Sequence, residues 1–346
     1  MNTRPGHSGS GVTIEDVARV AGVSRQTVSN ALNAPQRVRA QTLTRVIAVI
    51  DSLGYIPDQS ARSLKTGLRY TLGYMAPDDD PLNPNPVMGG FLTALCDAAA
   101  LAGYRILLFR PTEDPKRAID TLAAARQVDG FILSDILAND VRVQRLTELG
   151  LPFMTFGRTE PEQPQHWVDT DNVSGMREIA GALAAEGHRS VAYVYPEALT
   201  PWLRKRAEGF TEAARELDLS VILIHESPEH EPHDKGLVER LRTMLRGENA
   251  PTAVVTGNDV LAMSVYDAAR AAGLRVGTDV AVVGFSDLPL CQFLTPQLAS
   301  VRMPLTAIAQ KIIEQLLAQI RKEPTPEQGF YLQPELILRD SFYRTG

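Results

Sequence analysis

The chain has 346 residues, a length that suits two or three domains. It contains no run of about 18 apolar residues, so the sequence predicts no transmembrane helix and no membrane partner. The formal net charge of -6 is unevenly divided: residues 1–67 hold eight basic and four acidic side chains, and the rest holds 27 basic and 37 acidic ones. A basic head on an acidic body favours binding to a phosphate backbone, because the head gains affinity from counterion release while the body resists lying on DNA.

Residues 1–11 lack an apolar stretch, so we expect a disordered leader and no secretory signal. Cys96 and Cys291 are the two cysteines, and in a chain of this size they indicate reduced, buried thiols of a cytoplasmic protein. No second Cys or His lies at ligand spacing, so a cysteine-based metal site is not expected. Neither GxGxxG nor a P-loop motif occurs, and we expect no cofactor.

Residues 13–33 predict two short helices joined by a turn at Gly22. Apolar residues recur at helical spacing in the first segment, and Thr13 precedes Asp16 by three residues, as in a capping box. Ser24 is placed to cap the second segment. The apolar side chains that would pack the two helices together are Ile14, Val17, Ala18, Ala21, Val28, Ala31 and Leu32. This is the layout of a helix-turn-helix DNA reader.

Polar side chains near the start of the second helix would then point outward. Arginine, glutamine and asparagine carry the donor and acceptor geometry that reads base edges, and the second helix of such a pair lies in the major groove. A helical hairpin with a merely solvated polar face is the alternative. The candidate DNA contacts in this segment are Thr13, Ser24, Arg25, Gln26, Thr27, Ser29 and Asn30.

A third amphipathic segment, with Leu43, Val46, Ile47 and Ile50, would close a small three-helix core. Residues 12–67 resemble the N-terminal headpiece of the lactose-repressor/galactose-repressor (LacI/GalR) family of bacterial transcription regulators. The matching stretches are VTIEDVARVAGVSRQTVSNALN and LGYIPDQSARSLKTG, and the resemblance continues through the core to the RDS near the C-terminus. It implies a homodimeric regulator that is not an enzyme and whose partner is operator double-stranded DNA.

Residues 58–67 are expected to form a hinge helix, capped by Asp58 and stopped by Gly67. A helix this short is marginal in water, so we expect it to be loose in the free protein and ordered on DNA. Asparagine is common in the family where this chain has Asp58. Asp58 can still cap the helix, but we expect an added negative charge near phosphates to weaken the hinge contacts.

The resemblance implies that the hinge helices of a dimer pair in the minor groove. Leu64 occupies the position of a leucine that wedges between base steps, as apolar side chains do when they kink DNA. Ala61 and Lys65 match the flanking contacts. A Leu64 packed on the surface of the core is the alternative.

From residue 70 onward, apolar runs of four to seven residues alternate with helical stretches, which predicts parallel sheets with helices on both faces. The runs are TLGYMAP, RILLF, DGFILS, LPFMTFG, SVAYVYP, LSVILIH, AVVTG and VAVVGFS. The resemblance implies a core like the periplasmic sugar-binding proteins, with two doubly wound lobes and a ligand between them. The domains expected are a DNA-binding domain at 12–57, the hinge helix and a core at 68–346. We place the crossings near 160, 299 and 328, which gives an N-lobe of about 70–160 plus 299–327 and a C-lobe of about 161–298 plus 328–346.

Polar residues after the strands are candidates for effector binding, because ligands of such folds bind at the carboxyl ends of strands. Arg158 follows LPFMTFG, Arg206 matches the family's R-x-x-G-F arginine, and Asn258 matches an effector-binding asparagine. These side chains suit vicinal hydroxyls because each can bond at two sites. The alternatives are a loop anchor for Arg158, an interlobe salt bridge for Arg206 and a helix cap for Asn258.

Ser286 and Asp287 lie in GFSDLP, where many members of the family carry GFDD or GYDD. Ser286 therefore stands at the usual ligand-contacting aspartate, and the family's contact there is in doubt, although a hydroxyl can still donate. Trp202 either stacks on a sugar ring or is an exposed loop aromatic. Asn85 completes the candidate effector-binding set.

Two further groups of polar residues carry weaker signals. His225, His230 and His233 are interleaved with glutamates, a pattern more typical of a solvated loop than of a metal site. Asp169 and Asp171 have no nucleophile or acid beside them, so we interpret them as loop and helix-cap residues.

The sequence thus predicts a cytoplasmic repressor of carbohydrate uptake or metabolism genes. A small sugar bound between the lobes would control its operator affinity. A purine or other metabolite is the alternative effector, and a cytosolic sugar-binding protein that merely carries the head is the alternative from another class. No leucine heptads follow RDSFYRTG, so the tetramer-forming tail known in the family is not expected.

Overall fold

The computed structural model describes residues 12–55, 63, 66–76, 86–110, 114–159, 165–196, 200–226, 235–325 and 329–343. Contacts divide the chain into two units, Met1–Leu68 and Arg69–Gly346. The expected leader, most of the expected hinge helix, and the candidates Ala61, Leu64, Lys65 and Asn85 lie outside the described residues. In the ranges given above, no helix is both long and apolar enough to cross a membrane.

The first unit contains three packed helices, α1 (Ile14–Ala21), α2 (Arg25–Asn33) and α3 (Ala40–Leu53), with a short 3-10 turn η1 (Pro35–Arg37) between the last two. The Thr13 side chain accepts from the Asp16 N–H, and the Asp16 carboxylate accepts from the Thr13 N–H at 3.1 Å, which confirms the capping box. α1 ends at Gly22 with φ 62°, and Ser24 caps α2, both as predicted.

The core of this unit is built around Val17, Val28 and Val46, which are fully buried. The expectation for Ile47 is wrong, because its side chain is exposed. Ile47 follows Val46 directly and is therefore rotated by about 100° around the helix, away from the stripe that Val46 and Ile50 form. The apolar face of α3 is narrower than its sequence suggested.

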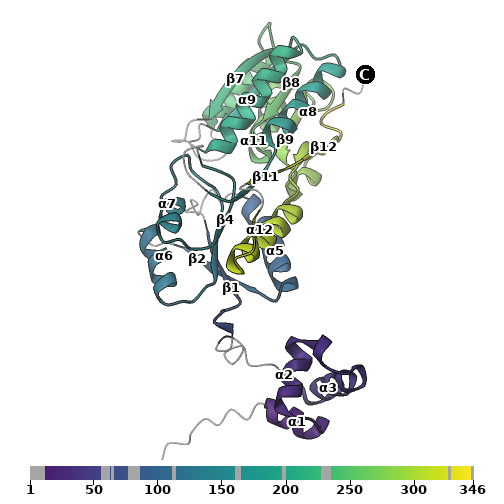
Figure 1. Cartoon of the computed structure of the whole chain (residues 1–346). Helices are drawn as coiled ribbons and strands as arrows, with labels where there is room; N and C mark the ends of the chain where they lie inside the picture. The colour runs from purple at the N-terminus through teal and green to yellow at the C-terminus, as the bar shows by residue number, and fades with distance from the viewer. Residues whose placement is uncertain are drawn as a thin grey trace, which may run out of the picture. The chain divides into compact units, whose positions relative to one another are not determined.

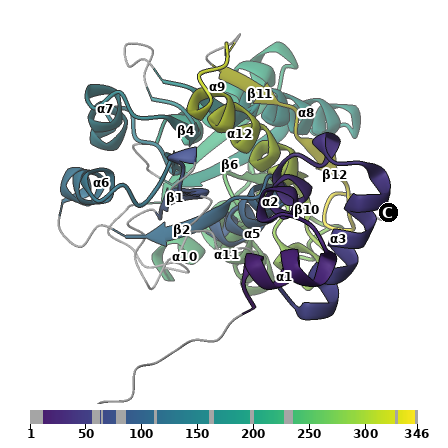
Figure 2. The same cartoon turned by 60° about the horizontal axis from the view of Figure 1, so that its bottom comes forward.

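The first lobe of the second unit holds a six-stranded parallel sheet with the order β11-β5-β4-β3-β1-β2. Its helices cover both faces (Figures 1 and 2). Strand residues such as Ile132 pack with α5 and α12, and their neighbours, such as Phe131, pack with α6 and α7. The elements are β1 (Thr71–Met75), α5 (Val87–Leu101), β2 (Arg105–Phe109), α6 (Pro115–Ala124), β3 (Gly130–Leu133), α7 (Val141–Glu148), β4 (Phe153–Phe156), β5 (Trp167–Thr170), α12 (Leu305–Ile320) and β11 (Gly329–Leu332).

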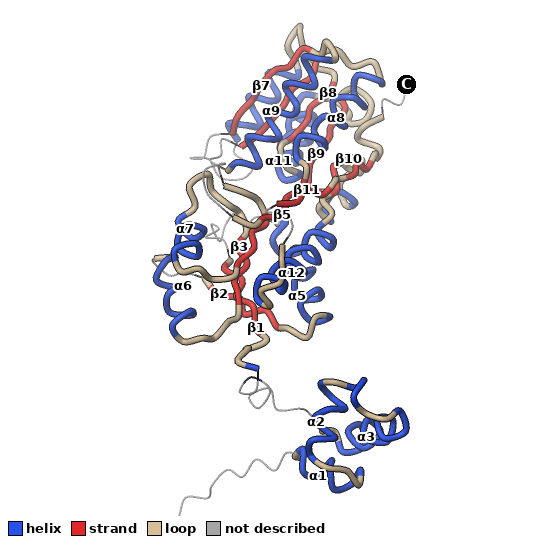
Figure 3. Tube along the Cα trace, in the orientation of Figure 1, coloured by secondary structure: helices blue, strands red, loops and turns tan. Residues whose placement is uncertain are grey.

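The second lobe repeats this plan with the order β12-β10-β9-β8-β6-β7, in which only the β10–β12 pair is antiparallel. Figure 3 shows its strands in red and its helices in blue. α8 and α9 pack on one face of the sheet, and α10 and α11 pack on the other. The elements are α8 (Asn172–Ala185), β6 (Ser190–Pro196), α9 (Pro201–Glu216), β7 (Ser220–Glu226), α10 (Lys235–Leu245), β8 (Ala253–Thr256), α11 (Asp259–Ala272), β9 (Ala281–Ser286), η2 (Pro289–Gln292), β10 (Ala299–Arg302) and β12 (Glu335–Ile337).

The lobe boundaries expected near 160, 299 and 328 are wrong, because each crossing lies later in the chain. β5 and β11 pair with each other in the first sheet, so the chain crosses after Thr170 and again after Leu332. β10 pairs with β9 in the second sheet, so the middle crossing follows Arg302. All eight apolar runs are confirmed as strands. The four strands beside the crossings escaped notice because they have only three or four residues, with polar or small side chains among them.

Two expectations about single side chains also change. Cys291 is buried, but Cys96 is exposed on α5 because it follows Leu95, which faces the core. His225 lies on β7 and not in a loop, while His230 and His233 lie outside the described ranges. Among the residues that the structure describes, no group of three or more metal-ligating side chains occurs.

Candidate functional site

The polar face of α2 is organised by hydrogen bonds between its own side chains. Gln26 donates from Nε2 to the Asn30 Oδ1 at 2.9 Å, and the Ser24 and Thr27 hydroxyls lie 2.9 Å apart. Arg25 is exposed, and its guanidinium lies 3.2 Å from the Glu15 carboxylate of α1. The helix therefore presents a glutamine, an asparagine and an arginine in a fixed arrangement. Ser29 is half-buried on the same helix.

Thr13 serves the structure of the first unit, since its hydroxyl completes the cap of α1. The pKa of Asp16 falls to about 2, first because of the hydrogen bond from the Thr13 side chain and then because of the one from Arg19. The Asp16 carboxylate is therefore ionised at neutral pH, the form that accepts these hydrogen bonds. DNA contact by Thr13 stays a prediction.

In the second unit, a cluster of polar and aromatic side chains surrounds Arg206, which is 2% exposed. Its Nε donates to the Asn172 Oδ1 at 2.8 Å, and its Nη1 donates to the Gly257 carbonyl at 2.7 Å. The guanidinium carbon lies 3.6 Å from the ring centroid of Phe285 and 4.5 Å from that of Trp202. These hydrogen-bond partners are neutral, unlike those of an interlobe salt bridge.

The glycine of the R-x-x-G-F motif explains how Arg206 reaches this position. A Cβ on Gly209 would lie 2.8 Å from the Val173 Cα, closer than packed atoms approach. Only glycine therefore lets α9 lie this close to the start of α8. The close approach brings Arg206, one turn earlier on α9, against Asn172, the first residue of α8.

Burial shifts the pKa values of two residues in and beside this cluster. It lowers the pKa of Arg206 to about 10, and it raises the pKa of Asp169 to about 7, because a charged side chain loses solvation in the interior. The interpretation of Asp169 as a loop residue is wrong, since it lies on β5 and is 7% exposed. Asp171 caps α8 by accepting from the Ser174 N–H at 2.9 Å, as predicted.

Arg158 lies two residues after the carboxyl end of β4. Its guanidinium carbon lies 5.5 Å from the ring centroids of both Trp167 and Tyr331. These two rings meet edge to face with centroids 4.8 Å apart. Arg158 therefore lies over an aromatic pair from β5 and β11, the two short strands whose sequences gave no clear signal.

Trp202 lies in the first turn of α9 and is half-buried, so the alternative of an exposed loop aromatic is wrong. Its indole Nε1 donates to the Asp135 Oδ1 at 3.4 Å. Asp135 follows β3 and has a positive φ of 50°. This hydrogen bond joins the two lobes at the carboxyl end of the first sheet.

The remaining candidates differ in what they contact. Asn258 caps α11 by accepting from the Leu261 N–H at 3.0 Å, as in the alternative weighed for it. Ser286 ends β9, is 8% exposed and has φ 123°. Asp287 is engaged elsewhere, because its carboxylate oxygens lie 2.8 Å from the Arg302 guanidinium and 2.7 Å from that of Arg339. This ion-pair geometry does not support Asp287 as an effector contact.

Sequence reasoning missed several residues of the Arg206 cluster. Asn172 follows Asp171 after a strand, a signal that is easily taken for helix capping alone. Phe285 lies inside a buried strand, and its sequence does not reveal that its ring faces a cation. Asp135 lies in a loop, and only the fold brings it to Trp202.

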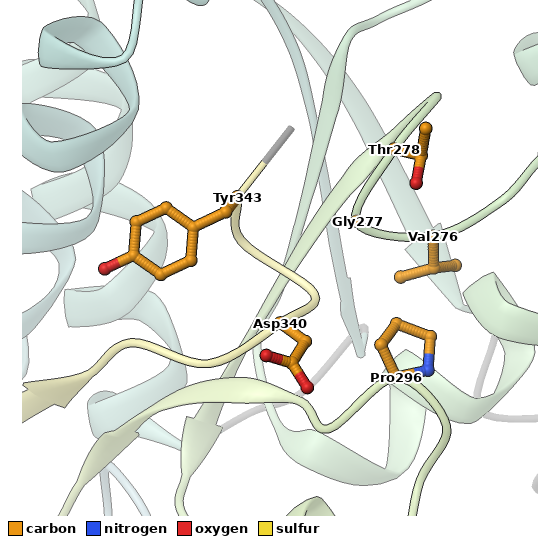
Figure 4. Close-up of a pocket in the computed structure, with 6 residues that line it drawn as sticks. All are labelled: Val276, Gly277, Thr278, Pro296, Asp340 and Tyr343. Carbon is orange, nitrogen blue, oxygen red and sulfur yellow. The ribbon is translucent and has the colours of Figure 1, made fainter. Parts of the chain in front are cut away.

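A cavity of about 360 Å³ lies elsewhere in the second lobe (Figure 4). It shares no residue with the Arg206 cluster. Several of its residues precede β9 and therefore lie toward the amino end of that strand, away from the strand ends at which ligands of this fold class bind. Its lining residues are Val276, Gly277, Thr278, Pro296, Asp340 and Tyr343.

Comparisons with known proteins agree on one family. Bacterial regulatory proteins, lacI family, match residues 13–58, and a periplasmic binding protein-like domain matches residues 180–342. The HTH-type transcriptional regulator AglR of Rhizobium meliloti (strain 1021) is 32% identical over 341 residues, which cover 95% of this chain and 94% of AglR. The ribose operon repressor of Escherichia coli (strain K12) is 30% identical over 345 residues, which cover 95% of this chain and 99% of the repressor.

Solved structures share the fold at similar identities. A regulatory protein of the LacI family from Chloroflexus aggregans has a TM-score of 0.73 at 32% identity and covers 80% of this chain and 99% of its own. A transcriptional regulator CelR–cellobiose complex has a TM-score of 0.70 at 26% identity and covers 95% of this chain and 99% of its own.

Proposed function

The chain belongs to the LacI family of bacterial transcriptional regulators, and from this premise we propose that it is a cytoplasmic, homodimeric repressor of carbohydrate uptake or metabolism genes. A small sugar bound between the lobes sets its affinity for operator DNA. The observation that carries the proposal is the buried Arg206 guanidinium, which packs against the Phe285 and Trp202 rings.

The chemistry of this cluster suits a sugar. A guanidinium donates in a fixed planar fork to adjacent sugar hydroxyls. An aromatic ring beside it packs against the apolar C–H face of the sugar ring. We propose ligand contacts from Arg206, Trp202, Arg158, Asn258 and Ser286, with Asn85 as a further candidate outside the described ranges. Asp287 is left out because of its two arginine partners.

The coupling to DNA follows from the position of the cluster. Trp202 and Arg206 belong to α9 of the second lobe, and Asp135 and Asp169 belong to the first. A ligand that bonds to both lobes stabilises one lobe arrangement over the other, which shifts a two-state equilibrium that the DNA site also senses. In the headpiece, the polar face of α2 is proposed to read bases. Roles for Ala61, Leu64 and Lys65 in the hinge remain sequence-based predictions.

The names of relatives support a sugar more than a purine. Proteins similar to this chain include the ribose operon repressor, the CelR–cellobiose complex and the regulator MalR of Streptomyces coelicolor, 30% identical. The repressor PurR of Photobacterium profundum is 28% identical, and stacked aromatic rings would also hold a purine base.

The deciding experiment uses the full chain and two assays. Retardation of the promoter DNA beside its own gene, against a shuffled sequence of equal length, tests DNA recognition. Calorimetry with ribose, maltose, cellobiose and hypoxanthine then tests the effector class, with each binder added back to the retardation assay. Binding of a sugar that changes retardation supports the proposal. Binding of hypoxanthine alone overturns the sugar assignment, and turnover of a sugar without DNA retardation overturns the regulator.

A further inference from the structure

The first residues of the second unit are clamped by one carboxylate. Asp129 accepts from the Arg69 N–H at 2.8 Å and 3.0 Å through its two oxygens, and from the Tyr70 N–H at 2.7 Å. Arg69 also donates from Nε to the Arg126 carbonyl at 2.7 Å. Three hydrogen bonds from two consecutive amides to one side chain hold the first residues of this unit against the start of β3.

The backbone at this point is held in an uncommon conformation. Tyr70 has a φ of 54°, a region that L-residues enter only when surrounding contacts hold them there. Its ring packs on Tyr104 with centroids 5.3 Å apart, and its carbonyl accepts from the Arg105 N–H at 3.0 Å. The Asp129 N–H donates to the Thr71 carbonyl at 2.8 Å, so β1 and β3 begin from the same clamp.

The other end of β3 lies at the proposed effector site. Ser134 follows β3 and shares a hydrogen bond of 2.7 Å with the Tyr74 hydroxyl of β1. Asp135 accepts from Trp202 of the second lobe. β3 spans Gly130–Leu133, so Asp129 comes directly before it and Ser134 and Asp135 come directly after it. One buried strand thus ends at the interlobe contact and begins at the chain exit.

The amino end of β3 is also tightly packed. A Cβ on Gly130 would lie 2.9 Å from a Leu316 methyl carbon of α12 and 3.1 Å from the Pro152 carbonyl oxygen. Only glycine fits here, so the strand next to Asp129 packs closely against α12 and Pro152. Movement of the first lobe carries the clamp with it.

We propose that Asp129 is the positioning residue that passes movement of the first lobe to the DNA-binding headpiece. Its carboxylate makes the exit at Arg69 and Tyr70 a rigid continuation of β3, so a change at Asp135 is transmitted as a change in chain direction. This inference rests on the proposed function, because it explains how that function couples its two sites.

The test compares Asp129→Ala with Asp114→Ala in the full chain. Asp114 is a matched control in the same lobe, where its carboxylate accepts from the Lys116 N–H and caps α6 away from the exit. Hydrogen exchange at the Arg69 and Tyr70 amides should quicken about tenfold or more in Asp129→Ala, because their acceptors are gone, and should stay unchanged in Asp114→Ala. Asp129→Asn, which keeps an acceptor oxygen but loses the charge, should fall between them.

DNA binding gives the functional readout, with a duplex selected from a random library by the wild-type chain. Affinity for this duplex should fall about tenfold in Asp129→Ala, since binding must then order freed backbone, while affinity for poly(dI-dC) stays unchanged. Asp114→Ala should keep its affinity for both DNAs. If Asp129→Ala folds poorly, Asp129→Asn takes its place in the comparison.

Three outcomes overturn the proposal. Equal exchange rates at the Arg69 and Tyr70 amides in both alanine variants would show that Asp129 does not hold these residues. Faster exchange in Asp129→Ala with an unchanged preference for the selected duplex would show that the clamp does not affect DNA binding. A wild-type chain that selects no sequence overturns the proposed function and the coupling with it, and the exchange result then reports on the clamp alone.

Discussion

The Trp202 indole of α9 donates to the Asp135 carboxylate across 3.4 Å, and this contact connects the two lobes of the second unit. The distance is long for a hydrogen bond, since most N–H···O bonds measure 2.7–3.2 Å. A bond this weak is easily exchanged for a better one. A ligand hydroxyl that bonds to either group would replace the direct contact at little cost and would take over the connection between the lobes.

Base reading by α2 is tested by Gln26→Ala. Gln26 is exposed at the first turn, where its amide is oriented by Asn30. We expect the variant to lose preference at one operator position at a cost of about 1–3 kcal/mol. Retardation of single-base operator variants measures this. Gln41→Ala, an exposed change on α3, is the control. An equal loss on every sequence would mean that Gln26 contacts the backbone.

The effector site is tested by Arg206→Lys. Lysine keeps the charge but lacks the planar fork that reaches Asn172 and the Gly257 carbonyl together. We expect ligand binding to weaken by at least tenfold, with operator affinity retained. The lost hydrogen bonds should lower the free energy of unfolding by about 1–3 kcal/mol. Calorimetry and thermal melting measure the two effects.

Arg177→Lys is the control for Arg206→Lys, because Arg177 also forms two guanidinium hydrogen bonds, here to the exposed Glu216 on the outer surface. Loss of operator affinity in Arg206→Lys without any ligand present would make Arg206 a structural residue only.

The raised pKa of Asp169 predicts that stability depends on pH. Its pKa is about 7 in the folded chain and about 3.9 in an unfolded one, so the folded state binds more protons between these values. Stability from this group is therefore complete below about pH 4 and is lost as pH rises through about 7. Asp169→Asn should remove that loss, which amounts to about 1.4 kcal/mol for each pKa unit.

The measurement for Asp169→Asn is the melting temperature at pH 5 and at pH 8. The melting temperature of Asp169→Asn should rise relative to that of the wild type between pH 5 and pH 8. The melting temperature of the exposed control Asp97→Asn should match that of the wild type at both pH values. A constant difference between Asp169→Asn and the wild type would show that Asp169 does not titrate in this window.

Backbone strain at Ser286 is tested by Ser286→Gly. A φ of 123° suits glycine and costs other residues about 1–3 kcal/mol. We expect the free energy of unfolding to rise by about 1 kcal/mol in the variant, because glycine adopts this φ without strain. The variant should also bind the effector more weakly, because the hydroxyl is gone. Ser174→Gly, inside α8, should instead lower stability by about 0.5–1 kcal/mol. Equal losses in both variants would contradict the strain.

Local rules were enough for the headpiece. Thr13, Gly22 and Ser24 do what their types and spacings predict, because caps and turns depend on a few neighbouring residues. The apolar runs were equally reliable, since a buried parallel strand needs a continuous apolar segment. Ile47 shows the limit of this approach, because a shift of one position along a helix separates the buried Val46 from the exposed Ile47.

The candidate site was harder to predict. Arg206 was found through its motif, but Asn172 and Asp135 meet their partners only after the lobes assemble, from positions 34 and 67 residues away in the chain. The lobe boundaries failed for a related reason. β5, β10, β11 and β12 are short, and polar or small side chains interrupt their apolar pattern, so they were not recognised. The crossings lie beside these strands.

The last two strands have a consequence for how the molecule is made. β11 and β12 complete different sheets, each at an edge, and both come from residues 329–337. The headpiece belongs to a separate unit that ends at Leu68. Because nascent chains fold from the N-terminus as they leave the ribosome, the DNA reader forms long before either lobe is whole. A chain that ends before residue 329 would therefore contain the whole headpiece but neither sheet in complete form.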